Sequence, residues 1–527
     1  MDILFVTPSS SPTLRNESIG TLILSKKAQL AGFSVKILRF WEIENKDYNS
    51  FEKEAIDKII NDNPKVVSFY CRGNEYHILI DLAMLIKKKS PNTIVVFGGP
   101  QAELAAKDTL HFFKSVDYIC CGEGENTIVP LLNLLVNPYA AINKDQIPGL
   151  VFRTKTGLIK SNDLPEMLPD NYCRSYMYYD LIPENVLKQS SSVSIDVGRG
   201  CPFSCTFCST KTFWKQRFRL RNLTDIINEI NYVSENYGNK LFSFSHDHFT
   251  VSKRRVHNFC QLIKELKNKI QWTCSSRIDC VDFGILEEMA NAGLVSIYYG
   301  IETGSSKIQE KINKRLNTQT CEEIVNYSIK LGISVTTSFI YGFPEETYDD
   351  LDQTLSLIVK LMCSGADVQL HILTFERGSA LYEKYKRDLV YKRGVSNDEF
   401  GVSELSTSIK SHPSVFSTFF DYQSQLRDEM KYLHTIHNIG REYPHTYTNI
   451  LIYLHNKGND YVTIYKLFIE ILEDSLERFE RKHTKLSKAI CYFMLEKLKY
   501  KITSTVILEK LGLTDIDANY IKKILII

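Results

Sequence analysis

The sequence has little of what a membrane-embedded or exported protein needs. None of its apolar runs approaches the roughly 20 residues that cross a bilayer. Its first eight residues, MDILFVTP, lack the basic start and apolar core of a secretory signal and are typical of a buried strand. We therefore expect a cytoplasmic protein without a membrane partner.

The sequence also lacks a strong charge of either sign and a regular pairing of cysteines. A formal net charge of +2 gives no electrostatic reason for nucleic-acid binding, so no nucleic acid is expected. Thirteen cysteines without a repeated spacing indicate a reducing compartment rather than a disulfide framework. At 527 residues the chain exceeds one ordinary core, so two or three domains are expected.

Three of the cysteines stand close together in the sequence. Cys201, Cys205 and Cys208 follow C-x3-C-x2-C spacing, and thiolates are soft ligands that suit iron–sulfur clusters. Tetrahedral zinc would want a fourth close ligand from a second C-x2-C or a His pair, and none lies nearby. Three thiolates can hold three irons of a cubane cluster, which leaves the fourth iron open. A structural zinc or buried-thiol loop is the alternative.

The run C-P-F-S-C-T-F-C at residues 201–208 resembles the signature of radical S-adenosylmethionine (SAM) enzymes. The resemblance implies a 4Fe–4S cluster whose open iron binds the amino and carboxylate groups of SAM, with Phe207 beside the adenine. It also implies an electron donor such as flavodoxin or ferredoxin, and cleavage of SAM to a 5′-deoxyadenosyl radical. An iron–sulfur module that only senses redox state is an alternative of another class.

Residues 1–137 alternate short apolar runs with helical patterns. This spacing predicts an α/β fold with a doubly wound parallel sheet, a Rossmann-like domain whose ligands bind at the carboxyl ends of the strands. The turns Gly98-Gly99-Pro100 and Gly122-Glu123-Gly124-Glu125 fall at such ends and resemble the cobalamin-binding domain that precedes many radical SAM cores. The resemblance implies cobalamin contacts from Thr7, Ser9, Ser68, Gly98, Gly99, Gly122, Glu123 and Gly124.

The same region departs from that family at one point. Residues 7–20 contain no histidine, so the Asp-x-His-x-x-Gly loop that supplies a cobalt ligand in other cobalamin domains is absent. Many radical SAM relatives lack this loop and hold cobalamin without a protein ligand to cobalt. A Rossmann-like domain that binds no cobalamin is the alternative.

The rest of the chain divides into three predicted parts. Residues 138–190 have the hairpin and proline patterns of a linker. Residues 191–394 resume the alternation, and six strands with parallel crossovers predict a partial (β/α)6 TIM-like barrel, the radical SAM core, with its chemistry at strand carboxyl ends. Residues 395–527 carry helical apolar spacing and predict a helical C-terminal domain that either recognises substrate or covers the barrel.

Polar residues follow several of the barrel strands, and the family resemblance implies that they bind SAM. Asp247 would hold the SAM amino group, Arg277 its carboxylate, for which a guanidinium fork is suited, and Glu302 the ribose or amino group. A structural pairing of Arg277 with Asp279 or Glu302 is the alternative. The resemblance also implies adenine or wall contacts from Gly342 and His371.

These features predict an enzyme that modifies an unactivated C–H position of a small molecule or peptide. The leading interpretation is cobalamin-dependent C-methylation in natural-product or peptide maturation, and the alternative is a cobalamin-independent peptide epimerase or cyclase. An epimerase needs a thiol that returns hydrogen, and the candidate is Cys363, with Cys274, Cys280 and Cys321 also in the barrel. Most buried cysteines, however, are inert core residues.

Overall fold

The computed structural model describes residues 1–9, 17–44, 48–137, 139, 141–238, 240–391, 407–481 and 488–524. They form two compact units. Unit 1 comprises Met1–Asp247, Leu266–Gln271 and Phe375–Asp421, and unit 2 comprises His248–Glu265, Trp272–Thr374 and Tyr422–Ile527. These units do not coincide with the four predicted parts. The predicted boundary at 394 lies outside the described residues.

Unit 1 contains a seven-stranded sheet of order β2-β1-β3-β4-β5-β6-β7. Its first five strands pair in parallel, and the β6–β7 hairpin adds an antiparallel edge. Strand β1 is buried throughout and apolar up to Thr7, because both faces of the sheet are covered. The strands are β1 (Ile3–Thr7), β2 (Val35–Arg39), β3 (Val66–Tyr70), β4 (Ile94–Gly98), β5 (Tyr118–Cys120), β6 (Leu150–Arg153) and β7 (Ile159–Ser161).

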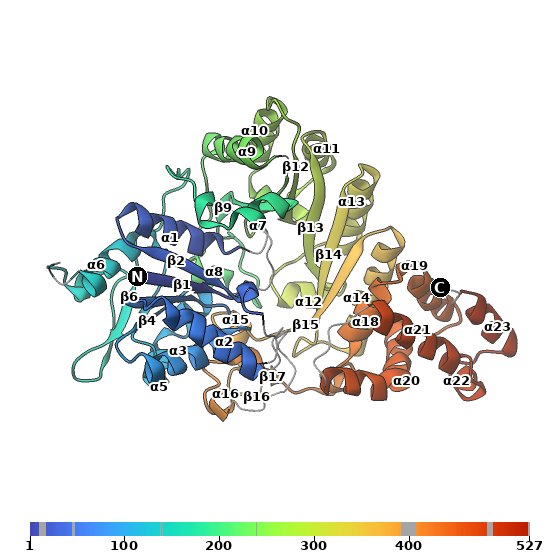
Figure 1. The fold of residues 1–527 in the computed structure, drawn as a ribbon. Coiled ribbons are helices and arrows are strands. Elements are labelled where there is room, and N and C mark those ends of the chain that lie inside the picture. The colour runs from blue at the N-terminus through green and yellow to red at the C-terminus, as the bar shows by residue number, and fades with distance from the viewer. Residues whose placement is uncertain are drawn as a thin grey trace. The chain divides into compact units, whose positions relative to one another are not determined.

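Helices cover both faces of this sheet, which confirms the predicted doubly wound fold (Figure 1). On one face α1 (Ile19–Leu30) packs against α6 (Ile128–Val136). The other face forms the core with four helices: α2 (Tyr48–Asn61), α3 (Tyr76–Lys89), α4 (Pro100–Leu104) and α5 (Ala106–Phe112).

A later segment of the chain also packs into this core. Val415, Phe416 and Phe419 are at most 2% exposed and belong to the same apolar cluster as β1, β3 and β4. The Phe416 ring lies 5.8 Å from the Phe113 ring. The predicted helical C-terminal domain includes these residues, so the structure places them elsewhere than expected. The segment contains α16 (Thr407–Ser411) and leads from β16 (Leu389–Tyr391) to β17 (Phe420–Tyr422).

Unit 1 also holds the start of the predicted radical SAM core. Strands β8 (Ser192–Asp196) and β11 (Leu241–Ser245) pair in parallel, and β9 (Gly198–Arg199) pairs antiparallel with β10 (Arg219–Leu220). Arg174 of the linker and Arg221 both pair with the fully buried Glu229, which ties the linker to this core. The helices are α7 (Glu184–Gln189), α8 (Thr210–Phe213), α9 (Leu223–Tyr237) and α15 (Ala380–Tyr385).

Unit 2 continues the strand–helix alternation that the sequence predicts. Strands β12 (Gln271–Arg277), β13 (Leu294–Glu302), β14 (Ser334–Tyr341) and β15 (Asp367–Ile372) pair in parallel in this order. Their carboxyl ends therefore meet at one edge of the sheet. The helices are α10 (Lys253–Lys264), α11 (Phe283–Asn291), α12 (Ser306–Lys311), α13 (Thr318–Lys330) and α14 (Tyr348–Cys363).

The rest of unit 2 is helical, as predicted. Arg441 of α18 donates three hydrogen bonds of 2.7, 2.8 and 2.9 Å to Asp367, which fixes this helix to the start of β15. The helices are α17 (Gln425–Glu429), α18 (Leu433–Arg441), α19 (Pro444–Asn456), α20 (Tyr461–Arg481), α21 (Lys488–Ile502), α22 (Thr505–Lys510) and α23 (Asp515–Ile524).

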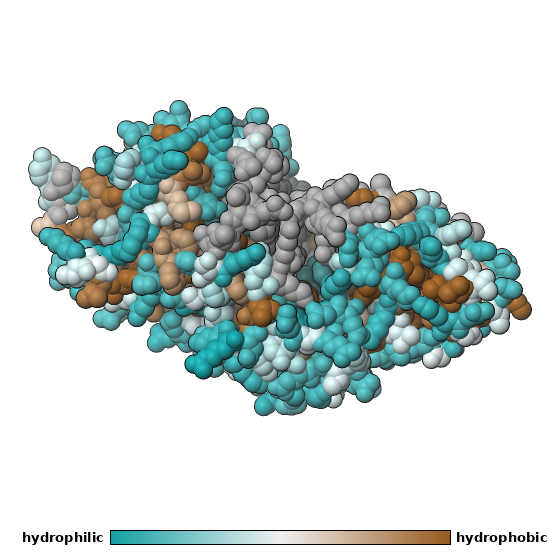
Figure 2. Space-filling view, turned by 90° about the horizontal axis from the view of Figure 1, so that it is seen from below, coloured by the Kyte–Doolittle hydropathy of each residue, from teal (hydrophilic) through white to brown (hydrophobic). Residues whose placement is uncertain are grey.

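The surface combines hydrophilic residues with scattered apolar ones. Figure 2 shows hydrophobic residues in separate patches among hydrophilic ones on the face that it draws. Phe493, Val506 and Ile516 of the last three helices are among the exposed apolar side chains. Within the described ranges, no helix combines the length and the apolarity that crossing a bilayer requires.

Candidate active site

The three motif cysteines lie in the loop of unit 1 between β9 and α8. Cys201, Cys205 and Cys208 are partly buried, and the Cys208 N–H donates to the Cys205 carbonyl at 3.2 Å. Phe207 lies in the same loop and is also partly buried. The loop begins at Gly200, whose φ is +85° and where an added Cβ would lie 2.0 Å from the Arg217 carbonyl oxygen. Glycine is therefore required there.

The donor set of this loop fits an iron–sulfur cluster. Burial raises the pKa of the Cys201 thiol to about 11, and the nearby Asp247, Cys205 and Cys208 add to the shift. Burial also raises the pKa of Cys208. In the described part of the chain, no three His, Cys, Asp or Glu side chains converge on a position for one metal ion. A cubane cluster does not require such convergence, because each thiolate binds a different iron.

Residues 375–381 hold the cysteine loop from another side within unit 1. The Thr206 carbonyl accepts a hydrogen bond from the Leu381 N–H at 2.9 Å, and the Ser209 hydroxyl donates to Glu376 at 3.0 Å. Asp247, predicted to bind SAM, also lies against this loop. Burial raises the pKa of Asp247, although hydrogen bonds from the Gly200 backbone and the Trp214 side chain oppose the shift. The structure therefore brings Asp247 and the cysteine loop together.

Two further predicted SAM residues lie at the carboxyl ends of strands in unit 2. Arg277 ends β12 and pairs with Asp279 through two hydrogen bonds of 2.8 and 3.0 Å, the arrangement that the sequence leaves open as an alternative. Glu302 ends β13, and its Oε1 lies 2.6 Å from Nζ of Lys314. Lys314 is not among the predicted site residues, because no local motif marks a lysine twelve residues after its partner.

Gly342 and His371 occupy the next two strand ends, with different surroundings. The Gly342 carbonyl accepts a hydrogen bond from Arg427, a fully buried side chain of α17 that also donates to the Leu373 carbonyl at 3.0 Å. His371 is exposed, and partial desolvation lowers its pKa. Arg427 is not among the predicted site residues, because 85 residues separate it from Gly342.

Of the candidate hydrogen-donor cysteines, only Cys280 lies beside one of these strand ends. Cys363 is an exposed residue that ends α14, just before the amino end of β15. It thus lies at the opposite end of that strand from the predicted chemistry. Burial raises the pKa of Cys274 and of Cys321, both of which are core residues. Cys280 follows β12 and is half-buried. Of these thiols, only that of Cys280 lies near the predicted chemistry, 3.9 Å from Oδ1 of Asp279.

The predicted cobalamin residues are divided between the carboxyl edge of the N-terminal sheet and positions that serve packing. Thr7 ends β1, with its hydroxyl 3.4 Å from that of Ser9, and Gly98 ends β4. Ser68 lies in the middle of β3. Added Cβ atoms at Gly99, Gly122 and Gly124 would contact Cys71, Pro165 and Leu24 within 3 Å, so these glycines allow close packing of the chain on itself.

Glu123 takes part in an ion-pair network within unit 1. Its Oε1 accepts from Arg199 at 3.0 Å and from Arg219 at 2.7 Å, and its Oε2 accepts the Leu168 N–H at 2.6 Å. Arg199 also donates to Glu125 at 2.5 Å. Because Arg199 lies two residues before Cys201, the Gly122–Glu125 turn fixes the strand that leads into the cysteine loop. Both oxygens of Glu123 are thus used by the protein itself.

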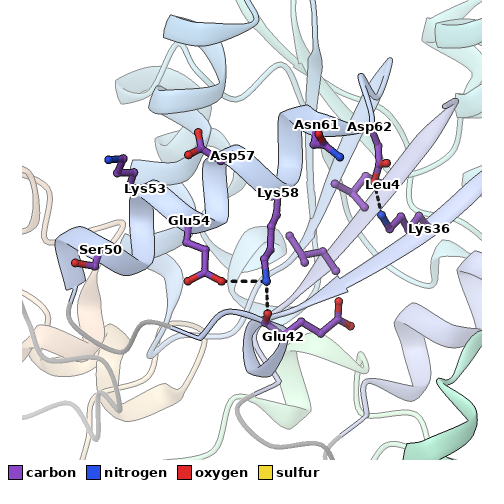
Figure 3. A pocket seen from close by; sticks show the side chains of 11 residues that line it. Leu4, Lys36, Glu42, Ser50, Lys53, Glu54, Asp57, Lys58, Asn61 and Asp62 are labelled. Carbon is purple, nitrogen blue, oxygen red and sulfur yellow. Dashed lines mark hydrogen bonds and ion pairs between the residues drawn. The ribbon is translucent and has the colours of Figure 1, made fainter.

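One groove of about 810 Å³ lies between β2 and α2, and Figure 3 shows its lining. Lys58 pairs with Glu54 at 3.0 Å and donates to the Glu42 carbonyl, and Lys36 pairs with Asp62. These two pairs use two of the three lysines and two of the four carboxylates that line the groove. The groove contains none of the predicted site residues.

Comparison with known proteins assigns the family. The model of the radical SAM superfamily matches residues 195–358, which include the three cysteines. An uncharacterized methyltransferase of Pyrococcus horikoshii is 30% identical over 333 residues, which are 62% of this chain and 71% of that protein. The chain belongs to the radical SAM superfamily. The model of the B12 binding domain matches residues 11–132, so this radical SAM protein carries a cobalamin-binding domain, as the resemblance implies.

Two further comparisons concern a relative and the fold. The anaerobic magnesium-protoporphyrin IX monomethyl ester cyclase of Cereibacter sphaeroides is 26% identical over 319 residues. The match covers 58% of this chain and about half (51%) of the cyclase. The structure of the radical SAM methyltransferase TsrM from Kitasatospora setae, solved with cobalamin and a 4Fe–4S cluster, matches with a TM-score of 0.61 at 15% identity. The match covers 79% of this chain and 85% of TsrM, and it confirms the predicted fold.

The family assignment confirms the predicted cofactors. A radical SAM protein uses a 4Fe–4S cluster and SAM, and the B12 binding domain supports cobalamin as the third cofactor. Both matches fall inside the predicted parts 1–137 and 191–394. The part boundaries and the roles of the individual site residues remain predictions.

Proposed function

We propose that this radical SAM protein transfers a methyl group to an unactivated carbon of a small molecule or peptide. The observation that carries the proposal is the combination of the three-cysteine loop with a B12 binding domain in one chain. When bound, the cluster and SAM supply a 5′-deoxyadenosyl radical, and cobalamin supplies a methyl group.

The residues of the chain would bind, orient and shield the reactants. Cys201, Cys205 and Cys208 would hold the cluster. SAM would be contacted by the other predicted site residues: Phe207, Asp247, Arg277, Glu302, Gly342 and His371. The site must hold the target C–H bond close to the 5′ carbon and exclude water, because the radical attacks any nearby C–H bond.

The chemistry also requires partners outside this chain. Reduction of the cluster needs a one-electron donor, for which we propose a flavodoxin or ferredoxin. Thirteen cysteines and an oxygen-sensitive cluster suit a reducing compartment such as the cytoplasm. The helical C-terminal part would recognise the substrate or cover the barrel.

Turnover with SAM that carries a trideuterated methyl group tests the proposal. The anaerobically reconstituted protein, a chemical reductant and candidate substrates are incubated, and the products are analysed by mass spectrometry. A product that gains a trideuterated methyl group, together with 5′-deoxyadenosine, is expected. No 5′-deoxyadenosine and no labelled product from any candidate would contradict the proposal and favour a cluster that only senses redox state.

Oxidative ring closure is the second candidate function. The observation that favours it is the cyclase among the relatives, which is 26% identical. Ring closure would give 5′-deoxyadenosine and an unlabelled product that has lost hydrogen, so the same experiment distinguishes the two reactions.

A further inference from the structure

Lys314 contacts both of the SAM residues proposed at the ends of β12 and β13. Its Nζ lies 2.6 Å from Oε1 of Glu302, and both side chains are at most 10% exposed. Its carbonyl oxygen accepts a hydrogen bond of 2.8 Å from Nη2 of Arg277. Lys314 thus contacts the Glu302 carboxylate through its side chain and the Arg277 guanidinium through its backbone carbonyl.

The backbone of β13 is shaped around the Glu302–Lys314 pair. A β-bulge lies between Gly300 and Glu302, and Glu302 has a φ of +73°, which side-chain-bearing residues rarely adopt. Bulges of this kind re-aim a side chain next to a site. A Cβ added at Gly300 would lie 2.4 Å from Oε1 of Glu302 and 2.9 Å from Nζ of Lys314, so the pair occupies the space that this glycine leaves.

The side chain of Gln309 fixes both partners of the pair. Its Nε2 donates to the carbonyls of Ile301 and Thr303, each at 2.8 Å, on either side of Glu302. Its Oε1 accepts the Leu316 N–H at 3.2 Å, and its own carbonyl accepts the Lys314 N–H at 3.0 Å. The backbone on either side of Glu302 and the loop that carries Lys314 are therefore both hydrogen-bonded to the buried Gln309.

The pair leaves part of the Glu302 carboxylate available to a ligand. Within the part of the chain that the structure describes, Oε1 accepts from Lys314 and no hydrogen bond reaches Oε2. We propose that Lys314 is a positioning residue that orients Glu302 and Arg277 for the hydroxyl, ammonium and carboxylate groups of SAM. This inference rests on the proposed function.

Equilibrium dialysis of SAM against the anaerobically reconstituted, full-length protein tests the inference. We compare Lys314→Met with Lys314→Arg, which keeps the cation, and with Arg315→Met, which removes the next cation of the same loop. Arg315 is a matched control because its side chain is 66% exposed and pairs only with Glu310 among the described residues. Iron content and circular dichroism report whether each variant keeps the cluster and the fold.

The expected result is a dissociation constant for SAM that rises about tenfold or more in Lys314→Met, with unchanged iron content. Lys314→Arg should recover most of the affinity, and Arg315→Met should stay within about twofold of the unmodified protein. The KM for SAM should rise in parallel in a 5′-deoxyadenosine assay, while kcat falls less.

Three outcomes would contradict either the role of Lys314 or the proposed function. Unchanged SAM affinity in Lys314→Met would overturn the inference while leaving the proposed function intact. Loss of iron and helicity in Lys314→Met and also in the milder Lys314→Gln would make the residue structural and would equally overturn it. Failure of the unmodified protein to bind SAM would instead contradict the proposed function.

Discussion

At the residue scale, we propose that thiols such as that of Cys205 hold the cluster. Replacing Cys205 with alanine removes one iron ligand, so we expect Cys205→Ala to lose the cluster absorbance and all SAM cleavage after anaerobic reconstitution. Cys173→Ala is the matched control, because Cys173 is an exposed free thiol outside the loop. SAM cleavage by Cys205→Ala would contradict the ligand assignment.

Glu346 predicts a pH dependence of stability. It accepts hydrogen bonds from the Gly342 and Phe343 N–H groups, and burial raises its pKa to about 8 from 4.5. The folded state thus keeps a proton that the unfolded state loses above pH 4.5. The contribution of Glu346 to the free energy of unfolding is therefore complete below pH 4.5. It falls by about 1.4 kcal/mol per pH unit as the pH rises towards 8.

Urea unfolding between pH 5 and 8 checks this prediction. Glu346→Gln keeps an acceptor for both N–H groups but cannot ionise, so its stability relative to the unmodified protein should increase steadily across the range. A constant difference between the two proteins would show that Glu346 does not hold a proton in the folded state.

The residues of the candidate site differ in how far the sequence predicts them. The cysteine loop could be predicted because its three cysteines lie within eight residues. The partner of Arg277 stayed open, because carboxylates both in its own loop and on the next strand could reach it. Lys314 and Arg427 could not be predicted, because no local motif marks either residue. Lys314 lies 12 residues after its partner Glu302, and Arg427 lies 85 residues after Gly342.

At the element scale, parallel strands such as β1 and β4 could be predicted because burial on both faces makes them almost entirely apolar. The packing of the segment 407–421 could not be predicted, because its few apolar residues follow neither a helical nor a strand period. It packs against the core of the N-terminal sheet through Phe416 and its neighbours. The exposed position of Cys363 likewise follows from where α14 ends.

Phe416→Ala tests this packing. Phe416 is 2% exposed, so its truncation should leave a cavity and lower the free energy of unfolding of unit 1 by about 3–5 kcal/mol. Leu158→Ala is the control, because Leu158 is 70% exposed in the β6–β7 hairpin and should change stability by about 0.5 kcal/mol or less. Similar effects of both substitutions in urea unfolding would contradict the packing.

At the scale of the whole molecule, the chain joins a B12 binding domain to a radical SAM core. We expect the purified protein to bind hydroxocobalamin in near-stoichiometric amount. Because residues 7–20 contain no histidine, the electron paramagnetic resonance spectrum of the reduced, bound cobalamin should lack splitting from a histidine nitrogen of that loop. Absence of binding in gel filtration would favour a reaction without cobalamin.

The central claim is that three thiolates leave one iron of the cluster open to SAM. Mössbauer spectroscopy of protein reconstituted with ⁵⁷Fe, recorded with and without SAM, tests it most directly. We predict a 4Fe–4S cluster in which the signal of a single iron shifts when SAM is added. Zinc in place of iron, or a cluster whose four irons are all indifferent to SAM, would contradict the account.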